Sequence, residues 1–85
     1  MAKVIPQPTP NPQAYKFTIE GHRFDAPVTI GDVAEAEGTP FERVFRLSGV
    51  ASVFATADFV TVTKDPAADW GELVDLARQA LEHSF

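Results

Sequence analysis

Few side chains in this sequence could hold a metal ion, because the chain contains no cysteine. Zinc sites and iron–sulfur clusters held by thiolates are therefore excluded. The imidazole and carboxylate candidates that remain close together are His22 and Asp25, in a segment expected to form a turn and the start of a strand. Their spacing of three residues in such a segment differs from the i, i+4 helical spacing that points two ligands at one ion. We expect no specific metal site, and name His22 and Asp25 as the candidates if iron binds through nitrogen and oxygen.

Nucleophilic catalysis finds no better support. The serines at positions 48, 52 and 84 all lie outside a Gly-x-Ser-x-Gly elbow. The neighbouring acidic residues are typical of helix caps and solvated charge, and no glycine-rich segment resembles a phosphate-binding loop. We therefore expect no catalytic residues and no enzymatic activity.

Prolines alternate with polar residues near the beginning of the sequence, which makes this segment stiff and extended. Such segments bind partners at low entropic cost, so the strip formed by Thr9, Pro10, Asn11 and Pro12 is a candidate partner-binding site. The side chain of Asn11 can also accept a hydrogen bond from the backbone two residues later. The second interpretation is therefore structural: the strip fixes how the chain enters the following strand.

Two β-rich runs at 50–55 and 59–63 are separated by three residues, which predicts a hairpin. Alternate residues of the second run point to opposite faces, and the alternation does not decide which set faces the core. Aromatic residues are mostly core residues. If any is exposed, we expect it to be Phe54 or Phe59, which flank the hairpin tip, so these two and Asp58 complete the predicted partner-binding residues.

The remaining elements follow from local signals. Residues 1–14 form a proline-rich arm that cannot be a helix or a central strand and is expected to lie along a sheet edge. Segments 15–19 and 23–30 alternate as strands, and Pro27 limits the second to an edge strand or splits it. A helical turn over 32–37 is capped by Asp32. A helix capped by Thr39 ends at Gly49, and a helix of about 15 residues follows Asp69.

This order, β-β-α-β-β-α after the arm, predicts an α+β fold. We expect a two-layer sandwich in which an antiparallel or mixed sheet of about four strands carries the two main helices on one face. The division is an arm over 1–14 and a single domain over 15–85.

Composition limits the function further. The chain has 85 residues, is 45% hydrophobic and carries a net charge of −5, and its seven Lys and Arg residues form no basic stripe. Nucleic acid and anionic membranes are therefore not expected as partners. The first residues lack a secretory signal, so the expected compartment is the cytoplasm. So small a core favours a binding module over an enzyme.

Several segments, in order, resemble one family. They are 8–12 (Pro-Thr-Pro-Asn-Pro), 14–17, 38–41 (Gly-Thr-Pro-Phe), 49–54, 58–64 and the Asp-Trp pair at 69–70. From about Gln7 to its end, the chain resembles the N-terminal domain of Nfu/NifU-type iron–sulfur cluster scaffold proteins. Gln13 stands where the family usually has a second Asn, Tyr15 where it mostly has an aliphatic residue, and Ala55-Thr56-Ala57 replaces a Phe-Gly-Pro turn.

In that family a second domain carries the Cys-x-x-Cys motif that holds the cluster, and this chain has no cysteine. The resemblance therefore implies an accessory or protein-interaction module in iron–sulfur cluster assembly, which docks onto a cysteine-bearing scaffold or a client protein. One alternative is direct iron binding through carboxylates and His22. Another is a structural domain that forms homo-oligomers by pairing an exposed sheet edge.

Overall fold

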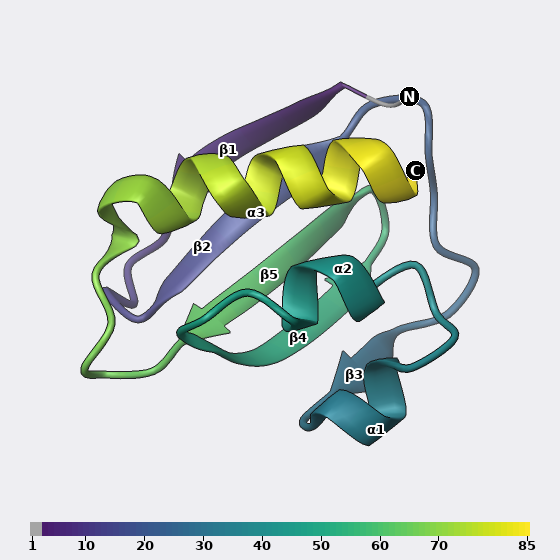
Figure 1. Cartoon of the computed structure of the whole chain (residues 1–85). Helices are drawn as coiled ribbons and strands as arrows, with labels where there is room; N and C mark the ends of the chain where they lie inside the picture. Colours follow the sequence, from purple (N-terminus) through teal and green to yellow (C-terminus); the bar gives the residue numbers. More distant parts are fainter. Residues whose placement is uncertain (1–2) are drawn as a thin grey trace.

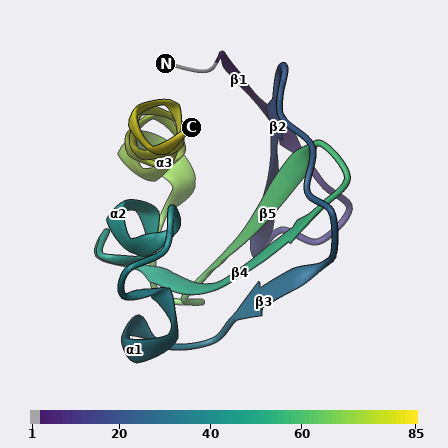
Figure 2. The same ribbon diagram turned by 90° about the vertical axis from the view of Figure 1, so that its right-hand side faces the viewer.

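The computed structural model describes residues 3–85. Five strands form one antiparallel sheet in the order β1-β2-β5-β4-β3, and the helices α1, α2 and α3 all lie on one face of it (Figures 1 and 2). The strands are β1 (Val4–Pro8), β2 (Ala14–Ile19), β3 (Val28–Ile30), β4 (Val50–Thr56) and β5 (Phe59–Lys64). The helices are α1 (Val33–Ala36), α2 (Glu42–Phe45) and α3 (Trp70–Ser84). The predicted α+β fold is confirmed, with two differences: the strands number five rather than four, and their order begins inside the arm.

The additional strand is β1, which pairs with β2 at the sheet edge although it contains two prolines. Lys3 accepts a backbone hydrogen bond from Glu20 at 2.9 Å, so every second residue from Lys3 onward faces β2. The backbone nitrogens of Val4, Pro6 and Pro8 therefore face away from β2, where a missing N–H costs no ladder hydrogen bond. The N–H of Val4 instead donates to the Glu82 carboxylate at 3.5 Å. The sequence predicts that the arm lies along a sheet edge, and in the structure residues 4–8 of the arm form the edge strand β1 itself.

The structure resolves which face of β5 is buried. Val60 and Val62 are fully buried, whereas Phe59 is half-buried on the opposite face. The two valines pack with Phe17 of β2 in the core beneath the helices, and Leu81 of α3 belongs to the same core. The hairpin is confirmed, with a turn at Ala57 and Asp58.

Two of the three helix starts agree with the sequence. Asp32 accepts from the Glu35 amide at 2.8 Å and caps α1, and Asp69 accepts from the Gly71 amide at 3.1 Å and caps α3. The expected helix from Thr39 is shorter than predicted. The Thr39 hydroxyl accepts from the Phe41 amide at 3.1 Å, but α2 itself covers only Glu42–Phe45.

Glycine is required at position 49, after α2, because the chain packs closely there. Gly49 has φ +97°, and a Cβ there would lie 2.8 Å from the Cβ of Ala68.

None of the helices in the described part of the chain is long and apolar enough to cross a membrane.

Candidate functional site

The strip at Thr9–Pro12 is a closed loop between β1 and β2 whose polar groups bond to one another. The Thr9 hydroxyl lies 2.9 Å from the Asn11 carbonyl oxygen and 3.0 Å from that of Ala14. The Asn11 Oδ1 accepts from the Gln13 amide at 2.9 Å, which is the Asx turn expected from the sequence. The side chains of Thr9 and Asn11 are therefore engaged in shaping the loop.

The same loop is fastened to the end of the sheet and to the start of α3. The indole Nε1 of Trp70 donates to the Pro12 carbonyl at 3.1 Å. The amide of Lys64 donates to the Gln13 carbonyl at 2.8 Å, and its Nζ reaches the Gln13 Oε1 at 3.0 Å. The Trp70 ring packs on Tyr15 with centroids 5.1 Å apart. The geometry supports the structural interpretation of the strip, and partner binding by it stays a prediction.

The strip and the hairpin tip lie at opposite ends of the sheet. Along the shared β2–β5 ladder, Thr63 pairs with Ala14 beside the strip, and Phe59 pairs with Thr18 at the other end. The five steps from Phe59 to Lys64 separate them by roughly 17 Å at the usual rise of a strand. The predicted partner-binding residues therefore form two separate groups rather than one patch.

The second group borders the face of the sheet opposite α1, α2 and α3 (Figure 2). Phe54 lies on this face with 40% of its surface exposed, paired with Thr61 of β5 and Thr29 of β3. Phe59 is half-buried, and the Lys16 Nζ lies 4.6 Å from the centre of its ring. We call this surface the open sheet face; its members are Ile5, Gln7, Lys16, Thr18, Thr29, Ser52, Phe54, Thr56, Phe59, Thr61 and Thr63.

The chemistry of the open sheet face differs from that of the rest of the molecule. The chain has twelve Asp and Glu residues, and none of them lies in a strand; Asp58 comes nearest, exposed in the hairpin turn. Within residues 3–85, the charged strand residues are Lys16, which lies on the open sheet face, and Lys64, which lies on the opposite face. Exposed aromatic side chains with few charges are typical of the centre of a protein interface.

The two metal-ligand candidates, His22 and Asp25, are not arranged as ligands of one metal ion. The His22 ring packs edge-on against Phe24, with centroids 4.7 Å apart, and tilted against Phe85, with centroids 4.8 Å apart. Phe41 continues this aromatic cluster. Asp25 is exposed in the following loop. Within residues 3–85, no three His, Asp or Glu side chains are gathered where they could hold one metal ion. Local sequence patterns could not predict this cluster, because Phe85 reaches it from a part of the chain about 60 residues away.

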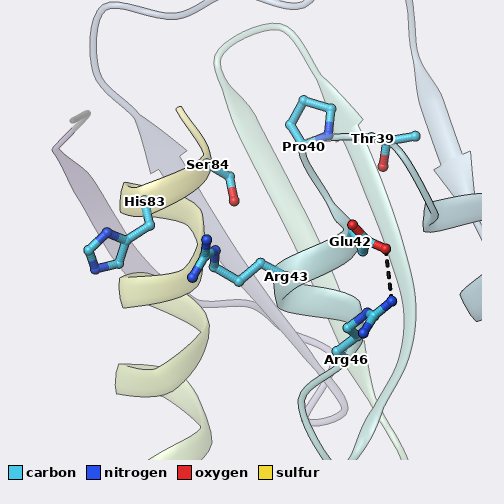
Figure 3. A pocket seen from close by; sticks show the side chains of 7 residues that line it. All are labelled: Thr39, Pro40, Glu42, Arg43, Arg46, His83 and Ser84. Carbon is cyan, nitrogen blue, oxygen red and sulfur yellow. Dashed lines mark hydrogen bonds and ion pairs between the residues drawn. The ribbon is translucent and has the colours of Figure 1, made fainter.

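Sequence reasoning also missed a cleft between α2 and α3 (Figure 3). It has a volume of about 470 Å³ and is lined by Thr39, Pro40, Glu42, Arg43, Arg46, His83 and Ser84. Its two walls are almost 40 residues apart in sequence, so local patterns could not predict it.

Comparison with known proteins places this fold in a family. The family model described as "Scaffold protein Nfu/NifU N terminal" matches residues 4–85. The chain belongs to this family. The resemblance drawn from the sequence motifs is thereby confirmed, and the absence of cysteine means that this Nfu N-terminal domain has no thiolate to hold a cluster.

Relatives and solved structures agree with this assignment. The chain is 40% identical to the NFU1 iron-sulfur cluster scaffold homolog, mitochondrial, of Drosophila willistoni, over 76% of this chain and 24% of that protein. The Drosophila ananassae homolog is 37% identical over 75% and 23%. The chain thus spans about a quarter of the length of these relatives.

In structure, protein SAV1430 of Staphylococcus aureus superposes with a TM-score of 0.80 at 23% identity, over 92% of this chain and 96% of that one, which shows a shared fold. SeR13 of Staphylococcus epidermidis has a TM-score of 0.65 at 27% identity over the whole of both chains.

Proposed function

We propose that this domain is a docking module that binds a cysteine-bearing protein of iron–sulfur cluster assembly through the open sheet face. The observation that carries the proposal is Phe54, a large aromatic side chain left 40% exposed on a face without acidic residues. Membership in the scaffold family supports the choice of partner.

The composition of the face indicates what would fit it. Phe54 and Phe59 offer apolar area toward the hairpin end of this face, with threonine side chains beside them. Its one charged side chain is Lys16, so a partner surface with an apolar centre and a carboxylate at its rim is complementary.

The iron–sulfur cluster itself enters this proposal as cargo. With no cysteine in the chain, the thiolates that hold it belong to the partner, or to other parts of a longer protein. The domain would then hold the partner in place and do no chemistry. The proposed compartment remains the cytoplasm; the word "mitochondrial" in the names of the Drosophila relatives describes those proteins.

A photo-crosslinking amino acid tests the proposal when it is placed at Phe54 in cells of the source organism. The matched control position is Leu76 of α3, which is 45% exposed and lies on the helical side. We expect cysteine-bearing cluster assembly proteins among the adducts from position 54 and none from position 76. Identical adducts from both positions, or no assembly protein at position 54, would refute docking through this face.

The substitution Phe54→Thr is the quantitative form of this prediction. If Phe54 is the hot spot of the interface, its removal costs at least about 2 kcal/mol, so binding to the captured assembly protein should weaken at least roughly 30-fold. The fold should lose only about 1–2 kcal/mol, because Phe54 is partly exposed already and threonine is a good strand residue. Calorimetric titration measures the first effect and urea denaturation the second; Leu76→Ala should leave binding unchanged.

A further inference from the structure

The cleft between α2 and α3 is the place where positive charge gathers on this acidic chain. Arg43 and Arg46 come from α2 and its C-terminal cap, and His83 comes from the last turn of α3 (Figure 3). Glu42 is the only acidic residue of the lining. Two of the seven Lys and Arg residues and one of the two histidines therefore share this cleft, while the whole chain carries −5.

The two guanidinium groups are available to a ligand. Arg43 is exposed and enters no ion pair or side-chain hydrogen bond within residues 3–85. Arg46 pairs with Glu42 at 2.9 Å, but the side chains are 63% and 34% exposed. An exposed pair of this kind holds its partners weakly, so a second carboxylate can compete for Arg46.

The hydroxyl groups of the lining add little to anion binding. The Thr39 hydroxyl donates to the Ala36 carbonyl at 2.7 Å, and the Ser84 hydroxyl donates to the Ala80 carbonyl at 2.8 Å. Each hydroxyl proton is therefore already used within its own segment. Recognition of a ligand falls to the arginines and the imidazole.

The directions of the arginines distinguish an extended ligand from a compact one. Arg43 points across the cleft toward α3 and His83, whereas Arg46 points away from α3 toward Glu42 (Figure 3). A single phosphate needs donors that converge on one point. Two diverging guanidinium groups instead suit two carboxylates carried by one chain, each held by a planar fork of N–H groups.

We propose that this cleft binds an acidic peptide segment of a partner protein, with one carboxylate on Arg43 and a second on Arg46. The site is on the helical layer and is separate from the open sheet face, so it does not depend on the proposed function. One partner could occupy either surface without the other.

The probe is an acetylated and amidated hexaglutamate peptide, added to the 15N-labelled full chain and followed by NMR. We expect saturable shifts of the backbone amides of residues 39, 41–46 and 83–84. Arg43→Gln should raise Kd about threefold, and the double variant with Arg46→Gln about tenfold, as for exposed guanidinium–carboxylate pairs. Binding should also weaken when salt is raised from roughly 0.05 M to 1 M.

Controls separate this site from general charge effects. Arg23→Gln makes the same charge change at an exposed residue outside the cleft and should leave Kd unchanged. A hexaglutamine peptide should not bind. The proposal is overturned if hexaglutamate causes no shifts at the cleft, if the double variant binds it as well as Arg23→Gln does, or if inorganic phosphate binds there as tightly as the peptide.

Discussion

Replacing Asn11 with alanine tests whether the loop between β1 and β2 is held by a side chain at its centre. In the wild type, the Asn11 Oδ1 accepts from the Gln13 amide at 2.9 Å. Alanine leaves that amide to water. Because the site is exposed, the cost is one ordinary hydrogen bond, about 0.5–1.5 kcal/mol. For a domain of this size, 1 kcal/mol lowers Tm by roughly 4–8 °C.

The loss should be transmitted to α3, because the next residue of the loop accepts the hydrogen bond of Trp70. The Pro12 carbonyl receives the indole N–H at 3.1 Å, and the Gln13 carbonyl receives the Lys64 amide at 2.8 Å. Urea denaturation followed by Trp70 fluorescence and by far-ultraviolet circular dichroism measures the change. We expect the fluorescence of the folded state to shift as well, since Trp70 is the only tryptophan.

Asn11→Asp is the matched control, because its carboxylate keeps the acceptor that the Asx turn requires. It should retain stability to within about 0.5 kcal/mol of the wild type, the usual range for a surface substitution. The reasoning is refuted if Asn11→Asp is as unstable as Asn11→Ala, or if Asn11→Ala costs nothing. In the latter case the strip would be free to serve as a binding site. Neither variant should change crosslinking at Phe54, which lies toward the other end of the sheet.

Two further predictions concern the same scaffold. Gly49→Ala should lower stability by about 2–3 kcal/mol in urea denaturation, because φ is +97° and the new Cβ would meet that of Ala68 at 2.8 Å; a loss below about 0.5 kcal/mol would contradict this. Arg78 donates to Asp75 and holds the pKa of that carboxyl below its ordinary value of 3.8. The stabilisation by this ion pair should be present above about pH 4 and disappear as the pH falls through the lowered pKa. The difference in the free energy of unfolding between the wild type and Asp75→Asn should therefore shrink in acid. A difference that stays constant from pH 7 to 2 would refute the role of the ion pair.

The parts of the fold that could be predicted from the sequence have local causes. The hairpin of β4 and β5, the Asp69 cap and the amphipathic face of α3 all depend on residues within a few positions of one another. The sequence analysis did not predict the strand β1, because prolines are compatible with a ladder only when their backbone nitrogens all face away from the neighbouring strand. That orientation depends on how β1 pairs with β2, which no pattern inside 4–8 reveals.

The candidate sites depend still more on tertiary packing. In the run Val53-Phe54-Ala55, alternation places Phe54 opposite the other two residues but does not say which side the helices cover. The helices cover the side of Val53 and Ala55, so the largest of the three side chains remains in solvent. The α2–α3 cleft requires Arg43 and His83 to be brought together by helix packing, and the short α2 was itself longer in the prediction.

The two sheet edges are poor sites for a partner that binds by adding a strand, which favours binding on the open sheet face or in the α2–α3 cleft. Along β1, Pro6 and Pro8 have no N–H to offer, and that of Val4 is directed at Glu82. A strand added at this edge could therefore donate hydrogen bonds to the carbonyl groups of β1, but β1 would offer its carbonyl groups no N–H in return. The other edge, β3, has three residues and follows Pro27. Homo-oligomers formed by edge pairing would therefore gain few hydrogen bonds. A partner gains more contact from the open sheet face or from the α2–α3 cleft on the other side of the molecule.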